Sequence, residues 1–182
     1  APLADLLFSR AGLSWFGGLI GGVGSGLVAL RLLRAPLVAA LAAAAPALAV
    51  GHLLGRVGCL LVGDDYGRPS RLPWAVAFPK GRPPTDVPVH PTQLYEALFL
   101  GWLTWLLIRE QRRGVPDRLI LGHYMILAGV FRFILEFIRI NQPVVFGFTL
   151  AQILAFILAA TGALLLTRAS SPRARQSRRA PS

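Results

Sequence analysis

The chain alternates between long stretches without charge and shorter polar connections. Three stretches contain no Asp, Glu, Lys or Arg, and they cover residues 11–30, 35–55 and 144–167. Two further stretches, 91–108 and 119–138, are apolar except for Glu96 in the first and Arg132 and Glu136 in the second. Because a helix needs about 20 mostly apolar residues to cross a bilayer, this pattern predicts an all-α, polytopic membrane helix bundle with about five transmembrane helices.

The polar connections differ in composition. Residues 56–90 are rich in Gly and Pro and carry charges of both signs, which predicts a polar, partly re-entrant loop. Residues 168–182 combine Ser, Pro and Arg, a composition typical of disorder. The sequence therefore predicts a transmembrane domain over residues 1–167 and a basic, disordered cytoplasmic tail over residues 168–182. If the tail is cytoplasmic, eleven of the 19 Lys and Arg residues lie on the cytoplasmic side, as the positive-inside rule favours. The 56–90 loop then faces the outside.

Composition narrows the class of protein. Hydrophobic residues make up 54% of the chain and charged residues 15%, against about 25% charged in soluble domains. The net charge is +11, yet no basic helix face or aromatic-interleaved basic strand points to nucleic acid, so membrane lipids are the expected partner. The single cysteine, Cys59, excludes an intrachain disulfide and a CxxC pair. We expect no metal and no cofactor, because the sequence has neither a ligand cluster nor a nucleotide loop.

Glycines recur along the first apolar stretch, at positions 17, 18, 21, 22, 24 and 26. Small residues four apart let helices approach closely in lipid, so close helix packing is one interpretation. The alternative interpretation is a site where a lipid head group fits against backbone that carries no side chains. The first apolar stretch has neither a basic region nor a cleavage site ahead of a mature domain, so we do not interpret it as a signal peptide.

Ionisable residues inside a span are costly and need a partner or a function. Arg132, Glu136 and Arg139 follow at i, i+4 and i+7, which places them on one face of a helix. In one interpretation Arg132 and Glu136 neutralise each other while Arg139 extends to the interface. In the other, the arginines form an anion site for a phospholipid phosphate, the geometry that a guanidinium fork matches.

Two polar clusters flank the second and fourth stretches. Arg56 lies between Gly55 and Gly58, where flexible backbone would let it turn toward a cavity and join Arg132 on one phosphate. The alternative is an ordinary interfacial arginine. In His90-Pro91-Thr92-Gln93-Leu94-Tyr95-Glu96, Pro91 suits a first helical turn, so His90 would cap the helix with Glu96 near its positive end. His90 would otherwise be a proton acceptor. His52 and His123 lack catalytic companions nearby in sequence and are interpreted as interfacial or packing residues.

Taken in order, these motifs resemble those of the prolipoprotein diacylglyceryl transferase family. The residues that carry the resemblance are Leu13-Ser14-Trp15-Phe16-Gly17-Gly18-Leu19, Gly55-Arg56-Val57-Gly58, Tyr66-Gly67-Arg68-Pro69, the His90–Glu96 cluster, and Arg132-Phe133-Ile134 with Glu136-Phe137 and Arg139. The match covers about residues 12–166 and would correspond to the later part of a seven-span protein, without its first two spans.

The resemblance implies a function in bacterial lipoprotein biosynthesis. Members move the diacylglyceryl group of phosphatidylglycerol to the lipobox cysteine thiol of a preprolipoprotein in the bacterial inner membrane, and they release glycerol phosphate. It implies Arg56 and Arg132 around the phosphate, with His90 as the candidate proton acceptor. The implied substrate-binding residues are Gly17, Gly18, Gly67, Arg68, Tyr95, Glu136 and Arg139.

Three positions depart from the family pattern. Phe16 stands where the family has His, Cys59 where it has Asn, and Ala128 where it usually has Tyr. Phenylalanine neither accepts a proton nor donates a hydrogen bond, so a transferase of this sequence needs another proton acceptor. The sequence therefore favours a diacylglyceryl transferase, and it leaves open a non-catalytic phospholipid-binding relative and an unrelated transporter or channel subunit.

Overall fold

The computed structural model describes residues 21–22, 24–141 and 147–169. Residues 1–40 and 41–182 are two compact units. In the first, residues 24–32 are helical. Most of the predicted 11–30 span, with Gly17 and Gly18, lies outside the described residues, and so does nearly all of the predicted tail. The other four glycines of the span, Gly21, Gly22, Gly24 and Gly26, lie within the described residues. The division at residue 167 and the packing of the glycines stay predictions.

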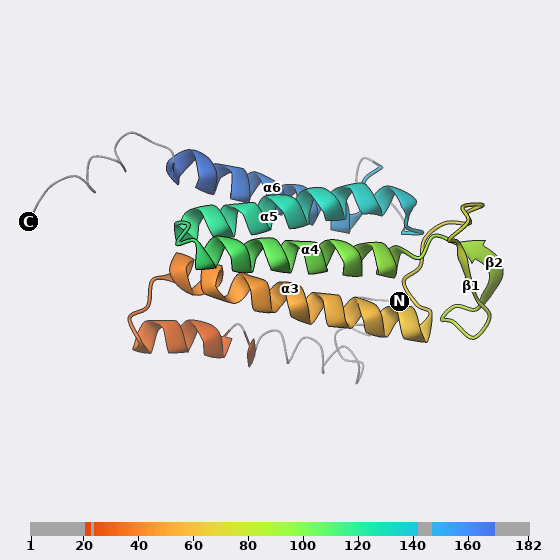
Figure 1. Ribbon diagram of the computed structural model, residues 1–182, viewed down its shortest axis with the longest axis horizontal. Coiled ribbons are helices and arrows are strands. Elements are labelled where there is room, and N and C mark those ends of the chain that lie inside the picture. Colours follow the sequence, from red (N-terminus) through yellow and green to blue (C-terminus); the bar gives the residue numbers. More distant parts are fainter. Residues whose placement is uncertain (1–20, 23, 142–146, 170–182) are drawn as a thin grey trace, which may run out of the picture. The chain divides into compact units, whose positions relative to one another are not determined.

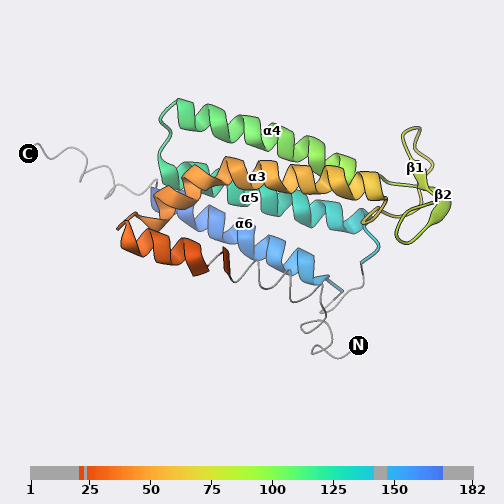
Figure 2. The same ribbon diagram turned by 90° about the horizontal axis from the view of Figure 1, so that it is seen from below.

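Four long helices follow one another in alternating directions (Figures 1 and 2). They are α3 (Leu37–Val62), α4 (Thr92–Arg112), α5 (Asp117–Leu135) and α6 (Leu150–Ala169), and the short 3-10 helix η1 (Glu136–Ile138) continues α5. The loop between α3 and α4 lies at one end of this bundle, and the short turn between α4 and α5 lies at the other. The architecture confirms the predicted all-α helix bundle.

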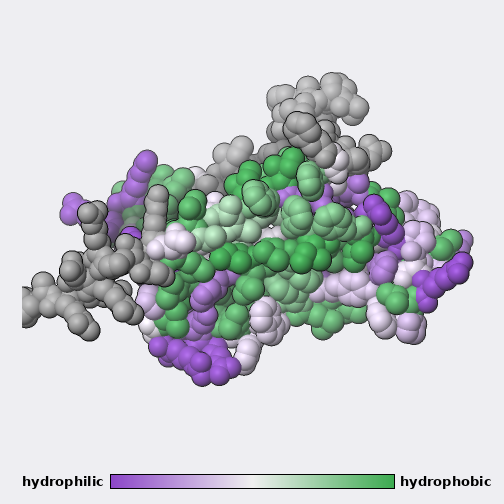
Figure 3. All heavy atoms as spheres, turned by 90° about the horizontal axis from the view of Figure 1, so that it is seen from above, coloured by the Kyte–Doolittle hydropathy of each residue, from purple (hydrophilic) through white to green (hydrophobic). Residues whose placement is uncertain are grey.

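Three of the described helical segments are long and apolar enough to cross a membrane. They are Leu37–Val62, Asp117–Ile138 and Leu150–Thr167. Many of their large apolar side chains are exposed, including Leu48, Leu54, Val130, Ile134 and Phe156, and Figure 3 shows hydrophobic residues along the middle of one face with hydrophilic residues toward its ends. In a membrane, lipid tails cover these apolar side chains, so they are not exposed to water. The protein is therefore a multi-pass membrane protein.

One predicted boundary was wrong, and one predicted span is less apolar than the others. The second span does not end at Gly55, because α3 continues for two more turns to Val62 and includes Arg56 and Cys59. Gly55 and Gly58 weaken a helix but do not terminate it without a further stop signal. The fourth predicted span forms α4, which is long enough but is not among the three most apolar segments, since it carries Glu96 and a charged last turn.

Helices α3 and α4 are joined at a helix defect. Pro46 lies inside α3, and because proline has no backbone N–H, the carbonyl of Ala42 loses its helical partner. The side-chain amide of Gln111 in α4 donates to the Ala42 carbonyl at 3.0 Å, which satisfies this buried acceptor. The contact holds the C-terminal end of α4 against α3.

Helices α5 and α6 make the closest helix contact of the 41–182 unit. A Cβ added to Gly129 would lie 2.6 Å from the Ala155 carbonyl oxygen and 2.9 Å from the Ala159 amide. A Cβ on Gly162 would lie 2.9 Å from the Gly122 carbonyl. Small residues thus bring the two backbones together, as in other membrane helix pairs, and fix α6 against the helix that carries Arg132.

We expect Gly129→Ala to destabilise the folded chain by about 1–3 kcal/mol, because the added methyl meets backbone atoms that cannot move independently. The thermal unfolding midpoint of the detergent-solubilised protein measures this. Gly101→Ala in α4 is the matched control, since its Cβ would meet only the Leu53 side chain at 3.5 Å. Equal midpoints for the two variants would contradict the close contact.

The α3–α4 loop folds back over the helix ends. Strands β1 (Val76–Phe78) and β2 (Thr85–Val89) form an antiparallel pair, and Gly67 bridges to Arg139. The Gly67 amide donates to the His90 carbonyl at 2.9 Å, and the Arg68 amide donates to the Ile138 carbonyl at 2.8 Å. A Cβ on Gly67 would lie 2.7 Å from the Ile138 carbonyl oxygen. Only glycine fits at this position. The loop thus packs against the end of the bundle that is formed by η1 and the start of α4.

Candidate functional site

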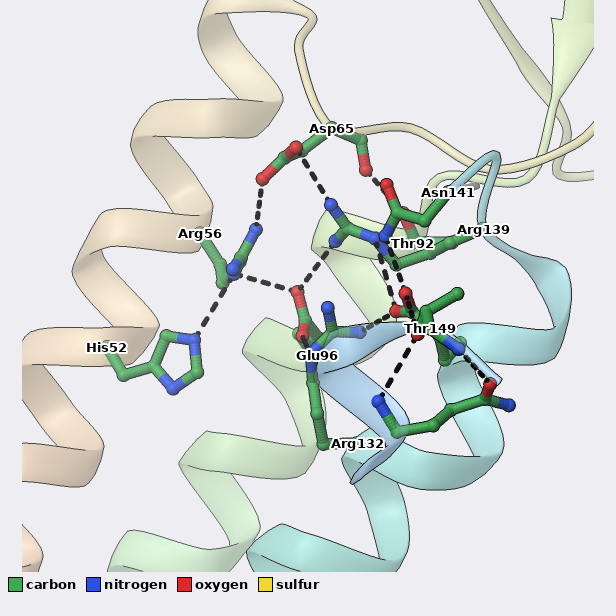
Figure 4. Close-up of polar contacts among 11 residues, drawn as sticks. His52, Arg56, Asp65, Thr92, Glu96, Arg132, Arg139, Asn141 and Thr149 are labelled. Atoms are coloured by element: carbon green, nitrogen blue, oxygen red, sulfur yellow. Dashed lines mark hydrogen bonds and ion pairs between the residues drawn. The ribbon is translucent and has the colours of Figure 1, made fainter. Parts of the chain in front are cut away.

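Six charged side chains meet where the α3–α4 loop covers the bundle (Figure 4). Three are arginines and three are carboxylates, so their formal charges cancel. They come from six segments of the chain: Arg56 from α3, Asp65 from the loop, Glu96 from α4, Arg132 from α5, Glu136 from η1, and Arg139 just after η1. We call this set the arginine cluster.

Glu96 lies at the centre of the arginine cluster. Its Oε2 is 2.7 Å from Arg56 Nε and 3.7 Å from Arg139 Nη1, and its Oε1 is 3.9 Å from Arg132 Nε. The side chain is only 2% exposed. A carboxylate this deeply buried needs opposite charges around it, and here three guanidiniums supply them. From the sequence, Glu96 was expected near the positive end of a helix that His90 caps, and its role in joining the arginines was missed.

Arg132 and Glu136 form the ion pair that their spacing predicts. Arg132 Nη1 lies 2.6 Å from Glu136 Oε2. The other oxygen of Glu136 accepts from Asn141 Nδ2 at 2.6 Å and from the Thr149 hydroxyl at 2.8 Å. The buried Glu136 is thus held between α5 and the first residues before α6.

Arg139 does not extend to the interface as one interpretation expected. Its side chain is 6% exposed, and Nη2 lies 2.8 Å from Asp65 Oδ1. The reason is local: α5 ends at Leu135, η1 tightens the chain, and Arg139 itself is extended at φ −84° and ψ 162°. The i+7 spacing places Arg139 on the face of Arg132 only in a continuous α-helix, whereas the observed backbone directs Arg139 back to the loop.

Asp65 ties the loop to two of the arginines. Its Oδ2 accepts from Arg56 Nη1 at 2.7 Å while Oδ1 faces Arg139. Partial burial acts to raise the pKa of Asp65, but the hydrogen bonds and positive charges of Arg56 and Arg139 outweigh it and lower that pKa below its ordinary value. The backbone supports the contact, because the Asp65 carbonyl accepts from the Thr92 hydroxyl at 2.8 Å.

The lowered pKa predicts a pH dependence of stability. The ionised carboxylate stabilises the folded chain above the unfolded Asp pKa of about 3.9, and this contribution is lost as pH falls through the lower folded pKa. The thermal midpoint of the wild type should therefore exceed that of Asp65→Asn at neutral pH, with the difference shrinking below about pH 3.9. Asp86→Asn, at an exposed position of β2, should show no such difference; a gap for Asp65→Asn that persists in acid would rule this out.

His52 lies beside the arginine cluster, although the sequence favoured an interfacial or packing role for it. It lies one turn before Arg56 on α3, and Arg56 Nε donates to His52 Nε2 at 3.3 Å. The i, i+4 spacing was the available signal. His123, in contrast, pairs with Glu110 at 2.8 Å, near the opposite end of α4.

His90 hydrogen bonds away from the arginine cluster. Its Nδ1 lies 3.3 Å from the Tyr95 hydroxyl, which also accepts from Trp74 Nε1 at 2.8 Å. His90 is not the helix cap either: Pro91 occupies the N-cap position, and α4 begins at Thr92. The side chain of Gln93 donates to the Asp64 carbonyl, a further link between loop and helix that sequence reasoning missed.

The remaining predicted site residues are distributed unevenly. Gly67 and Arg68 hold the loop through their backbones, as described above, and the Arg68 side chain is exposed. Gly17 and Gly18, with Phe16, lie outside the described residues. The structure therefore brings Arg56, Arg132, Glu136 and Arg139 together and leaves His90 and Tyr95 on a neighbouring hydrogen-bond chain.

Exposure within the arginine cluster is unequal. The side chains of Arg56 and Arg132 are 17% and 24% exposed, whereas Glu96, Glu136 and Arg139 are nearly buried. In the described part of the chain, the Nη2 atoms of both exposed arginines make no hydrogen bond or ion pair. On the loop side, a cavity of about 250 Å³ is lined by Asp65, Tyr66, Arg82, Pro83, Arg139, Ile140 and Asn141. Arg56 and Arg132 do not line this cavity, but their unused Nη2 groups leave donors that suit a small anion.

Comparison with known proteins shows what the chain is similar to. The family model described as prolipoprotein diacylglyceryl transferase matches residues 2–168. Three similar proteins carry the name phosphatidylglycerol–prolipoprotein diacylglyceryl transferase. The protein from Methylococcus capsulatus is 40% identical over 136 residues, which are 71% of this chain and 50% of that protein.

The other two relatives align over more of the chain. The protein from Geobacter sulfurreducens is 34% identical over 92% of this chain and 66% of its own length, and that from Nitratidesulfovibrio vulgaris is 33% identical over 96% and 68%. The chain thus spans between 50 and 68% of the length of these relatives. No solved structure matches it significantly.

Proposed function

The chain belongs to the prolipoprotein diacylglyceryl transferase family, and from this membership and the arginine cluster we propose that it transfers the diacylglyceryl group of phosphatidylglycerol to the thiol of a lipobox cysteine in a prolipoprotein. The three similar proteins are named for this donor and this class of acceptor. We place the reaction at the outer face of the bacterial inner membrane, where the loop and the arginine cluster would lie, with the basic 168–182 tail in the cytoplasm.

One observation carries the proposal. Two partly exposed guanidiniums, from α3 and α5, face the same buried carboxylate of Glu96. Each guanidinium has five N–H donors in a planar fork, so both keep donors for a phosphate while Glu96 and Glu136 fix their positions. Preorganised donors of this kind stabilise charge that develops in a transition state.

The chemistry assigns a task to each group. The thiol sulfur loses its proton to a base and forms a bond to the phosphate-bearing carbon of the diacylated glycerol. The carbon–oxygen bond to the phosphate breaks, its electron pair stays on the phosphate oxygen, and glycerol phosphate leaves. Arg56 and Arg132 would offset the charge on that oxygen. Arg139 acts as a positioning residue, because its contacts go to Asp65 and Glu96.

The test follows the mass of a synthetic lipobox peptide incubated with phosphatidylglycerol and the purified chain in detergent. We expect a gain of one diacylglyceryl unit, and no gain with Arg132→Ala. The absence of a gain in the wild type, with an active relative as positive control and with retained lipid binding, would overturn the proposal and favour a non-catalytic phospholipid-binding protein. Restoration of transfer by Phe16→His would then identify the missing proton acceptor.

A further inference from the structure

The reaction proposed above needs a group that accepts the thiol proton, and we propose that this group is His52. This inference rests on the proposed function and adds a catalytic residue to it. The sequence offers Phe16 where the family has a histidine, and phenylalanine has no lone pair for a proton. A base must therefore come from another position.

The hydrogen bond from Arg56 defines the protonation of His52. Arg56 Nε donates to His52 Nε2 at 3.3 Å, and a nitrogen can accept only when it carries a lone pair. His52 is therefore a neutral imidazole with its own proton on Nδ1. Neutral imidazole is the form that a general base requires.

The position of His52 fits the task. It lies on α3 at i−4 from Arg56, so the two side chains share one helix face, and Figure 4 shows the ring directed at Arg56 beside the arginine cluster. Its side chain is exposed, so a substrate thiol can reach it. The charged groups that act on the ring are Arg56, Glu96 and Arg132, and we place the first and the last of these around the phosphate.

The other proton acceptors of the site are less suited. Glu96, Glu136 and Asp65 all pair with arginines, so their carboxylate oxygens are already engaged by cations. The Nδ1 atom of His90 meets the Tyr95 hydroxyl, which is in turn held by Trp74. Among the described histidines, His52 alone contacts the arginine cluster.

The proton transfer completes the reaction without another reactant. Arg56 first turns its N–H group from His52 Nε2 to the phosphate oxygens, which frees the lone pair of that nitrogen. His52 Nε2 then takes the proton from the thiol as the carbon–sulfur bond forms, and the electron pair of the broken carbon–oxygen bond leaves with the phosphate. The imidazolium afterwards releases its proton to water, which restores the neutral ring.

Mass-based transfer assays of His52→Ala and His52→Gln test the inference. We expect kcat to fall about 10²–10⁴-fold, the usual contribution of a positioned general base, with a smaller change in the KM for phosphatidylglycerol. Added imidazole should restore part of the activity of His52→Ala only. His123→Ala on α5, where the ring pairs with Glu110 away from the arginine cluster, is the control and should keep wild-type kcat. Wild-type kcat in His52→Ala, or a comparable loss confined to His90→Ala, would overturn the inference.

A second measurement does not depend on turnover. Nitrogen NMR of the purified chain labelled at histidine reports the tautomer of each ring, and we expect the His52 signal to show an unprotonated Nε2 and a protonated Nδ1 at neutral pH. The opposite tautomer, or an imidazolium, would overturn the assignment of His52. If the expected tautomer is found but the wild type transfers no lipid, the proposed function fails and the geometry of His52 stands.

Discussion

Glu96→Gln should lower the free energy of unfolding by about 3–5 kcal/mol, the usual effect of removing one member of a buried ion pair. The substitution keeps the size of the side chain but leaves Arg56, Arg132 and Arg139 facing a neutral amide in a nearly water-free position. Because α3, α5 and the segment after η1 all reach this α4 carboxylate through their arginines, we expect the loss to affect the stability of the whole 41–182 unit. Unfolding in mixed detergent micelles, followed by circular dichroism, measures it.

Glu110→Gln provides the matched control on the same helix. Among the described residues Glu110 pairs only with His123, and its side chain is 15% exposed. We therefore expect a loss below about 1 kcal/mol, as for partly exposed pairs. Similar losses for the two variants would show that Glu96 does not organise the arginine cluster.

Arg132→Lys should lower kcat of the proposed transfer by about 10²–10³-fold, as does the loss of a preorganised donor to a developing negative charge. Lysine keeps the positive charge beside Glu136, so the fold should be retained, but it lacks the planar fork that binds two phosphate oxygens at once. The KM for phosphatidylglycerol should change less than kcat, since the charge to be stabilised grows in the transition state.

An arginine-to-lysine substitution elsewhere on α5 is the control for effects on kcat that do not depend on the position of Arg132. Arg118→Lys alters an exposed residue in the first turn of α5, far along the helix from Arg132, and should leave kcat unchanged. Initial rates of peptide modification at several lipid concentrations give both constants. A wild-type kcat in Arg132→Lys would show that the guanidinium geometry does not contribute.

Local helix geometry explains which parts of the site the sequence predicted. The Arg132–Glu136 contact follows from i, i+4 spacing on a helix, which holds wherever that helix exists. Gly67 was predicted to matter, and the structure supplies the reason in its close approach to the Ile138 carbonyl. The apolar stretches located α3, α5 and α6 because lipid imposes both their length and their composition.

Contacts between distant segments explain the failures. The central position of Glu96 depends on how α3, α4 and α5 pack, which no spacing within α4 reveals. Arg139 was misplaced because the change from α5 to η1 rotates the backbone by an amount that a helical wheel does not include. His52 was passed over because its partner Arg56 was expected in a turn, whereas α3 keeps both residues on one helical face.

The central claim is that Arg56 and Arg132 together hold the phosphate of phosphatidylglycerol. Phosphorus NMR of this lipid in detergent micelles, titrated with the purified chain, tests it most directly because it observes the phosphate itself. We predict a saturable change in the phosphorus signal with the wild type and at least about tenfold weaker binding with the double variant Arg56→Lys/Arg132→Lys, the size expected for lost charge-assisted hydrogen bonds. An unchanged titration curve in the double variant would contradict the account.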